Sequence, residues 1–297
     1  MAVTDPRQVL RRYGLRPRKG LGQNFLVDRR ALERIVEAAE LTPADTVLEV
    51  GPGVGQLTRL LSEAAGRVVA VELDAQLVAL LRQELADRPN VEVVEGDILQ
   101  VDPAALARGA PYKVVANLPY YITSAALRHL LEARPAPALL VVTVQEEVAA
   151  RITARPPQMS LLAVSVQFYG RPRRVARIPA GAFYPPPKVD SAVVRIDVYP
   201  PGERPVQVDD VEWFFHVVRA GFGQRRKQLR NSLAAGLHRT SAEVEAALAR
   251  AGIEPHRRAE TLSLEEWARL SAELATPCHR AAAAGASMRK EKHPRLP

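Results

Sequence analysis

The sequence predicts an α/β protein in which a parallel sheet carries helices on both faces, followed by a smaller all-helical domain. Between residues 46 and 144, five short apolar runs alternate with segments of helical periodicity. This alternation is typical of strand–helix–strand units. Beyond Pro200-Pro201-Gly202 the apolar spacing is helical throughout. The change of period indicates a domain boundary near residue 200.

The elements before the boundary follow from the spacing of apolar residues. Residues 29–40 place Leu32, Ile35 and Val36 on one helical face. The predicted strands are 46–50, 67–71, 91–94, 113–116 and 138–144, with helices between them that begin near Leu57 and at residues 75–85 and 124–132. Two further strands are predicted at 161–168 and 191–198, on either side of a proline-rich loop at 183–188.

Four helices are predicted after the boundary, at residues 211–220, 225–235, 241–250 and 264–274, with Ser241 as the N-cap of the third. Residues 276–297 combine an alanine run with basic residues, which predicts a disordered basic tail. The predicted organisation is therefore a basic N-terminal segment (1–30), a sheet domain (31–200), a helical domain (201–275) and the tail (276–297).

Composition places limits on the class of protein. The 297 residues are 47% hydrophobic and 25% charged, as in ordinary globular proteins. No apolar run approaches the roughly 20 residues that span a bilayer, and the N-terminus has no apolar signal segment. The single cysteine, Cys278, excludes a disulfide framework and a cysteine metal cluster. We expect a cytoplasmic monomer that has no metal site and no membrane contact.

The net charge of +8 is concentrated at the two ends of the chain. Lys and Arg outnumber Asp and Glu by eight to two in residues 1–30 and by sixteen to twelve in residues 200–297, whereas residues 31–199 hold seventeen against nineteen. Basic flanks around a nearly neutral centre suit an enzyme that acts on nucleic acid. Biased codon usage is the alternative explanation.

A basic helix in the second domain is the candidate nucleic acid contact. We expect its basic side chains to bind RNA phosphates, although a charged face can also be merely solvated. These side chains are Arg219, Arg225, Arg226, Lys227 and Arg230.

A glycine-rich turn and two acidic residues follow the first three predicted strands of the sheet. Gly51-Pro52-Gly53-Val54-Gly55 is a strand-to-helix turn whose backbone N–H groups can approach a ligand. Glu72, 21 residues after Gly51, suits the two hydroxyls of a ribose, and Asp97 suits an adenine amino group. Each acid alone is equally consistent with a helix cap or a turn. Together they predict an adenosine-containing ligand.

The fourth strand ends in Asn117-Leu118-Pro119-Tyr120. Proline cannot donate to a sheet and holds Leu118 extended, with its carbonyl facing outward. The Asn117 side-chain oxygen and the Leu118 carbonyl are then two acceptors beside an aromatic ring, as an exocyclic amine of a nucleobase requires. This end favours S-adenosylmethionine over NAD as the cofactor. The alternative is a turn with a buried amide and a core tyrosine.

With these residues assembled, the chain resembles the KsgA (RsmA) family of ribosomal RNA small-subunit adenine N6,N6-dimethyltransferases, from about residue 19 to residue 274. The motifs that carry the resemblance are GLGQNFLVD (20–28), LEVGPGVGQLT (48–58), VELD (71–74), EGDIL (95–99), ANLPYYIT (116–123), FYPPPKVDSAVVRI (183–196) and GFGQRRKQLRNSL (221–233). Glu146 departs from the family pattern, in which lysine is frequent, and this makes an RNA contact there doubtful.

The resemblance implies a Rossmann-like class I methyltransferase sheet that binds S-adenosylmethionine. It implies cofactor contacts from Asn24, Leu26, Gly51, Gly53, Glu72, Asp97 and Asn117. It implies that Tyr120 and Phe183 sandwich the target adenine, although Phe183 taken alone is equally consistent with a core aromatic. The implied substrate is two adjacent adenosines near the 3′ end of 16S rRNA, in the small (30S) subunit. The resemblance also implies that the protein has a role in subunit biogenesis.

Two alternatives share much of this pattern. An erythromycin-resistance-type methyltransferase of large-subunit RNA has the same strand-end residues, but the 183–191 loop and the RRKQLRN segment favour the small-subunit enzyme. A non-catalytic assembly or transcription factor is the second alternative, and the intact strand ends argue against it. The expected catalytic residues are Asn117, Leu118, Pro119, Tyr120 and Phe183.

Overall fold

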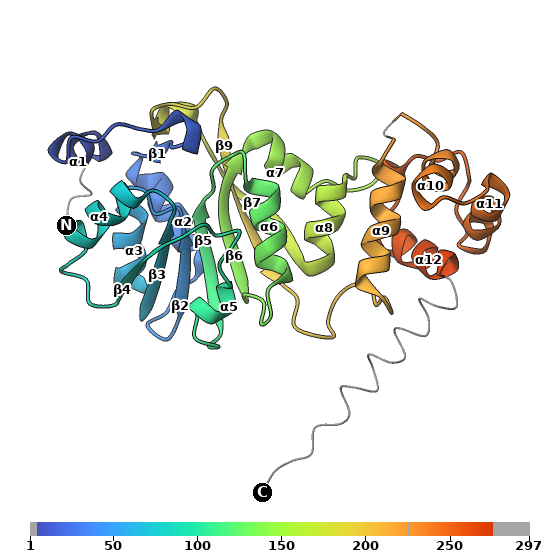
Figure 1. Cartoon of the computed structure of the whole chain (residues 1–297), viewed down its shortest axis with the longest axis horizontal. Helices are drawn as coiled ribbons and strands as arrows, with labels where there is room; N and C mark the ends of the chain where they lie inside the picture. The colour runs from blue at the N-terminus through green and yellow to red at the C-terminus, as the bar shows by residue number, and fades with distance from the viewer. Residues whose placement is uncertain (1–4, 225, 276–297) are drawn as a thin grey trace, which may run out of the picture. The chain divides into compact units, whose positions relative to one another are not determined.

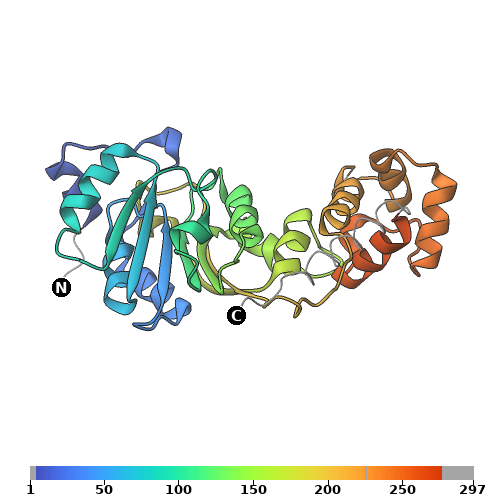
Figure 2. The ribbon, with the colours of Figure 1, turned by 60° about the horizontal axis from the view of Figure 1, so that its bottom comes forward.

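The computed structural model describes residues 5–224 and 226–275. The chain divides into two compact units, which Figures 1 and 2 show. Unit 1 contains the residues up to Thr153 and Tyr169–Pro200, and unit 2 contains Ala154–Phe168 and the residues from Pro201 onward. The predicted tail, 276–297, lies outside the described residues.

Unit 1 is built on a seven-stranded sheet in the order β4-β3-β2-β5-β6-β9-β7. The five predicted parallel strands are confirmed. They are β2 (Thr46–Val50), β3 (Arg67–Glu72), β4 (Val91–Glu95), β5 (Tyr112–Asn117) and β6 (Leu139–Gln145). The sheet is mixed, because β9 (Ser191–Val198) and β7 (Gly170–Ile178) run antiparallel to their neighbours.

Helices cover both faces of this sheet. Successive strand residues point to opposite faces, and both Val47 (0% exposed) and Leu48 (1% exposed) of β2 are buried. On one face, α2 and α3 pack with Val47, Val115 and Val193 in a single core cluster. The helices of unit 1 that accompany the sheet are α2 (Arg29–Ala39), α3 (Gln56–Ala64), α4 (Ala75–Glu84), α5 (Pro103–Leu106), α6 (Thr123–Glu132) and α7 (Glu146–Ile152).

The prediction of a strand at residues 161–168 was wrong, because this segment forms helix α8 (Leu161–Tyr169). The run LLAVSVQF is almost continuously apolar, so its periodicity does not separate a buried strand from a buried helix. Phe168 stacks on Phe214 within unit 2, with ring centroids 4.9 Å apart. Strand β7, in contrast, was not predicted, because its arginines and proline obscure the strand pattern of an edge strand.

Between Pro201 and residue 275, the described part of unit 2 contains four helices, namely α9 (Val211–Phe222), α10 (Leu229–Leu237), α11 (Ser241–Arg250) and α12 (Leu264–Leu274), with a 3₁₀ turn at Ala259–Thr261. Helix α10 begins four residues later than predicted. Thr240, not Ser241, caps α11, in a capping box with Glu243. Within the described residues, no helix combines the length and apolar character that a membrane span requires.

The N-terminal segment is a folded arm on unit 1. Its helix α1 (Pro6–Arg12) buries Val9 and Leu10 against α4. A 3₁₀ turn (Lys19–Leu21) leads to β1 (Phe25–Leu26), which pairs with β8 (Phe183–Tyr184). Asp74, at the start of α4, accepts hydrogen bonds from Arg18 (3.2 Å) and Gln23 (3.0 Å). These contacts hold the arm along the carboxyl edge of the sheet.

Candidate active site

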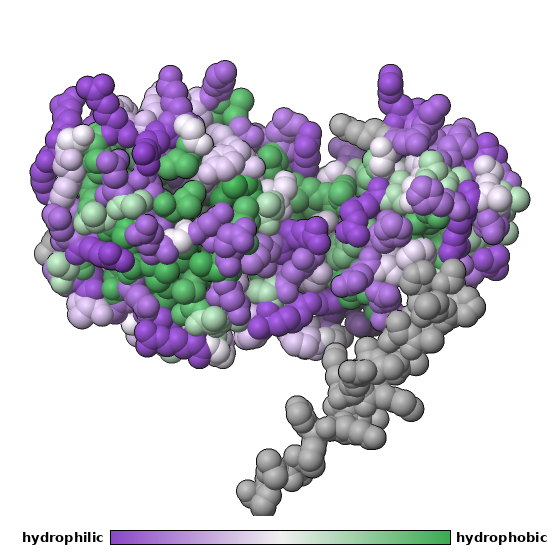
Figure 3. Space-filling view, in the orientation of Figure 1, coloured by the Kyte–Doolittle hydropathy of each residue, from purple (hydrophilic) through white to green (hydrophobic). Residues whose placement is uncertain are grey.

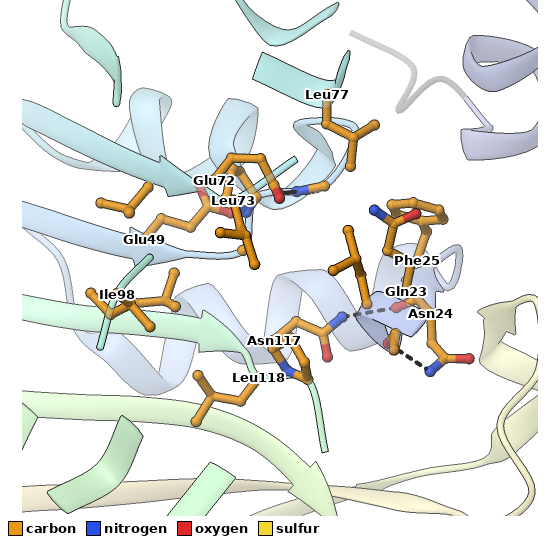
Figure 4. A pocket seen from close by; sticks show the side chains of 18 of the residues that line it. Gln23, Asn24, Phe25, Glu49, Glu72, Leu73, Leu77, Ile98, Asn117 and Leu118 are labelled. Carbon is orange, nitrogen blue, oxygen red and sulfur yellow. Dashed lines mark hydrogen bonds between the residues drawn. The ribbon is translucent and has the colours of Figure 1, made fainter. Parts of the chain in front are cut away.

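The site lies where the order of the parallel strands reverses. Strands β3 and β4 extend from one side of β2, and β5 and β6 extend from the other. Ligands of such sheets bind outside the strand ends at this switch point. A cavity of about 370 Å³ opens there (Figure 4). Its walls include ten of the predicted residues: Asn24, Leu26, Gly51, Gly53, Glu72, Asp97, Asn117, Leu118, Pro119 and Tyr120.

The glycine turn after β2 meets both the N-terminal arm and the end of β5. Gly51 and Gly53 have positive φ angles of 68° and 62°, which favour glycine. A Cβ on Gly53 would lie 2.8 Å from the Phe25 ring, and a Cβ on Gly51 would lie 3.7 Å from the backbone oxygen of Asn117. The turn therefore lies beside the backbone of Asn117, the residue whose side-chain amide the sequence predicts to be an acceptor.

Two carboxylates line the same cavity: Glu72 is the last residue of β3, and Asp97 lies in the loop after β4. Glu72 is 7% exposed and accepts backbone hydrogen bonds from Gly53 (3.2 Å) and Asp74 (3.0 Å). Burial raises the pKa of Glu72. One oxygen of Asp97 accepts from the Leu99 amide at 2.9 Å. Each carboxylate thus shapes its own loop and keeps further acceptor capacity for the hydroxyl and amino groups of an adenosine.

The Asn117 amide is oriented by the N-terminal arm. Its Nδ2 donates to the backbone oxygen of Asn24 at 3.1 Å (Figure 4). This contact occupies the donor end of the amide and leaves Oδ1 as an acceptor toward the cavity. The Leu118 amide donates to Thr143 at 3.2 Å, and no described residue donates to the Leu118 carbonyl. The end of β5 therefore offers two acceptors on consecutive residues that both line the cavity, Asn117 Oδ1 and the Leu118 carbonyl.

The Tyr120 ring is held by a residue that sequence reasoning missed. Its hydroxyl is 2.8 Å from Oγ of Ser191, a fully buried residue at the start of β9. Burial raises the pKa of the Tyr120 hydroxyl, and the Ser191 hydrogen bond opposes the rise only in part. Ser191 follows Asp190 in the 183–196 motif. The sequence around a strand serine does not indicate which distant side chain its hydroxyl contacts.

Phe183 is not among the residues that line the cavity. It is 4% exposed and packs in the core cluster, where β8 pairs it with Leu26. This position corresponds to the alternative interpretation of Phe183 as a core aromatic. Its contact with a target base stays a prediction.

Glu49 is a second residue that sequence reasoning did not assign. It lines the cavity from β2, is 1% exposed, and its Oε2 has no hydrogen-bond partner among the described residues. Burial raises its pKa to about 8, an effect that the Thr58 hydroxyl opposes and the Glu72 carboxylate reinforces. The sequence feature that could have identified Glu49 is the presence of an acid within the otherwise apolar strand TVLEV.

The pair of Tyr120 and Ser191 can be tested by a double-mutant cycle. We expect Tyr120→Phe and Ser191→Ala each to lower kcat for methyl transfer several-fold, because either change removes the hydrogen bond that orients the ring. The double variant should lose little more than one single variant, with a coupling of about 1 kcal/mol. Additive losses would show that the hydrogen bond does not orient Tyr120. Thermal unfolding of all three variants separates orientation from stability.

The predicted RNA-binding residues do not form one basic helix. Arg219 is exposed on α9, whereas Arg226 and Lys227 are exposed in the turn before α10. Arg230, on α10, forms an ion pair with Glu245. Arg225 lies outside the described residues. Figure 3 shows mostly hydrophilic side chains over the visible face of unit 2, with small apolar areas between them.

The mixed seven-stranded sheet, with its switch point, a glycine turn after the first parallel strand and acids at the ends of the next two, is of the class I methyltransferase type. Residues 14–276 match the protein family described as ribosomal RNA adenine dimethylase. The chain belongs to this family. Within the described residues, no group of three or more His, Cys, Asp or Glu side chains is arranged to hold a metal ion.

Individual relatives agree with the family match. The ribosomal RNA small subunit methyltransferase A of Dehalococcoides mccartyi is 52% identical over 266 residues, which are 89% of this chain and 91% of the relative. The crystal structure of the 23S rRNA methyltransferase ErmE has a TM-score of 0.67 and 34% identity, over 84% of this chain and 99% of that one. A dimethyladenosine transferase from Plasmodium falciparum, at 23% identity, shares the fold with a TM-score of 0.70, over 83% and 95%.

Proposed function

We propose that this enzyme transfers methyl groups from S-adenosylmethionine to the N6 atoms of two adjacent adenosines near the 3′ end of 16S rRNA. It acts as a monomer on the small ribosomal subunit or its precursor and contributes to subunit biogenesis. The observation that carries the proposal is the end of β5. There the Asn24 carbonyl holds Asn117 Nδ2 and leaves Oδ1 as an acceptor, the Leu118 carbonyl follows as a second acceptor, and the Asn117 backbone lies beside the glycine turn. The name of the 52% identical relative supports the choice of subunit.

The residues at the strand ends suit the cofactor. S-adenosylmethionine supplies an electrophilic methyl group on a sulfonium. Glu72 would accept from the ribose hydroxyls and Asp97 from the adenine amino group, while the Gly51 and Gly53 backbone allows close approach. Asn24 and Leu26 would contact the ligand from the arm side of the cavity.

The two acceptors suit an amine nucleophile. The lone pair of an adenine amino group is delocalised into the ring, so the nitrogen is a weak nucleophile. Asn117 and Leu118, accepting its two hydrogens, would favour tetrahedral geometry and direct the lone pair toward the methyl group. Pro119 holds the Leu118 carbonyl in place, and Tyr120 would stack on the base. Positioning of this kind supplies much of the rate.

The proposal is tested by methyl transfer to ribosomal particles from a source that lacks the modification. We expect N6,N6-dimethyladenosine at two adjacent positions of 16S rRNA, detected by mass spectrometry. Transfer to large-subunit RNA would favour an activity like that named for ErmE. Cofactor and particle binding without transfer would favour an assembly factor. Monomethyladenosine alone after extended turnover would contradict dimethylation.

The basic residues that precede α10 in the sequence give a separate prediction. Replacing Arg225, Arg226 and Lys227 together by glutamine should weaken RNA binding. It should also flatten the dependence of log Kd on log salt by about 0.7 to 0.9 for each phosphate that the variant no longer neutralises. Cofactor affinity should not change. Arg250→Gln is the matched control, since Arg250 is an exposed arginine that pairs with Glu273. An equal loss of RNA and cofactor affinity would refute this division of roles.

A further inference from the structure

Tyr121 is an exposed aromatic residue in the wall of the active-site cavity. Four large hydrophobic side chains are exposed in the described part of the chain: Leu73, Tyr121, Leu161 and Val189. Tyr121 is the most exposed of them, at 60%, and it lines the cavity together with Leu73. An uncovered aromatic face at a ligand site is a surface on which a flat ring can stack.

The ring of Tyr121 is supported from beneath by the N-terminal arm. Gly22 has a φ angle of 62°, and a Cβ built there would lie 3.3 Å from Cδ1 and Cε1 of Tyr121 and 3.6 Å from Cβ of Pro119. The Gly22 backbone therefore packs against the ring, with Pro119 also beside that glycine, while most of the ring surface stays open to solvent. A ring that is already held in place loses little conformational freedom when a ligand stacks on it.

We propose that Tyr121 stacks on the nucleobase next to the target adenosine. The inference rests on the proposed function, and it adds a second base site to it. Tyr120 and Tyr121 are consecutive, and Tyr120 is the half-buried ring that Ser191 anchors beside the two acceptors. A base held at those acceptors leaves the neighbouring base of the same strand at the mouth of the cavity, where Tyr121 lies. Stacking of this kind tolerates any base, because every base has a π face.

The test measures binding of RNA fragments that contain two adjacent adenosines, by fluorescence anisotropy. Matching fragments carry an abasic site on the 5′ or the 3′ side of the target adenosine. We expect Tyr121→Ala to weaken binding of the intact fragment about 5- to 140-fold, the range that stacking of one base supports. One of the two abasic fragments lacks the base on which Tyr121 is proposed to stack. The same substitution should change binding of that fragment by less than twofold. Tyr121→Phe keeps the ring and should bind the intact fragment like the wild type.

Equal losses on the intact fragment and on both abasic fragments would overturn the inference. It would also be overturned if Tyr121→Ala weakened S-adenosylmethionine binding, measured by calorimetry, and left RNA binding unchanged, because the ring would then be only a wall of the cofactor cavity. Failure of the proposed function appears separately, as a wild-type enzyme that binds these fragments but transfers no methyl group to ribosomal particles. Tyr121 is exposed, so thermal unfolding of its variants should match the wild type.

Discussion

Asn117→Ala is expected to lower kcat for methyl transfer by about 10² to 10³, the effect of removing one preorganised hydrogen-bonding group from a reacting centre. Its Oδ1 is one of two acceptors for the amino group, and the Nδ2 contact with Asn24 holds that oxygen toward the cavity. Methyl transfer at saturating RNA and cofactor measures the effect. The side chain is only partly buried, so unfolding should change little.

A second variant separates the acceptor from its orientation. Asn117→Asp retains acceptor oxygens but no longer donates to the Asn24 carbonyl, so we expect it to remain at least tenfold below the wild type. Calorimetry with S-adenosylmethionine is the control, since Asn117 is also a proposed cofactor contact. If saturating cofactor restored full turnover to Asn117→Ala, its role as acceptor for the amine would be contradicted.

Glu49→Gln is expected to change how stability depends on pH. The pKa of Glu49 is raised from 4.5 to about 8 in the folded protein. Between these values the folded state holds a proton that the unfolded state has lost, so this group lowers the unfolding free energy as pH rises from about 4.5 to 8. The full effect, at about 1.4 kcal/mol per pKa unit, is on the order of a few kcal/mol. Glutamine does not titrate and removes this slope.

Denaturant unfolding of the ligand-free protein between pH 5 and pH 8.5 measures the effect. We expect the variant to gain stability over the wild type as pH rises, and parallel curves would contradict the assignment. Cofactor binding supplies a second measurement. S-adenosylmethionine carries a net positive charge, so ionised Glu49 should favour it, and wild-type affinity should rise toward pH 8. The Glu49→Gln variant should lack this rise.

Local patterns predicted the sheet well and the second unit less well. Strands β2 to β6 were predicted because each is a short apolar run that ends at a turn residue. Helix α8 was mistaken for a strand because its apolar run lacks a polar face that would reveal its period. The predicted start of helix α10 was placed too early, at Arg225, because arginine and lysine are compatible with a helix. In the structure Arg226 and Lys227 lie in a turn before the helix.

The sequence by itself determined which chemical groups end each parallel strand, because a strand and the turn after it are local features. From the parallel order it followed that Gly51, Glu72, Asp97 and Asn117 would meet at one edge. Only the tertiary structure decided the orientation of Asn117 by Asn24, the anchoring of Tyr120 by Ser191, the burial of Phe183 and the raised pKa of Glu49. Each of these depends on contacts between residues far apart in the chain, and no local pattern records such contacts.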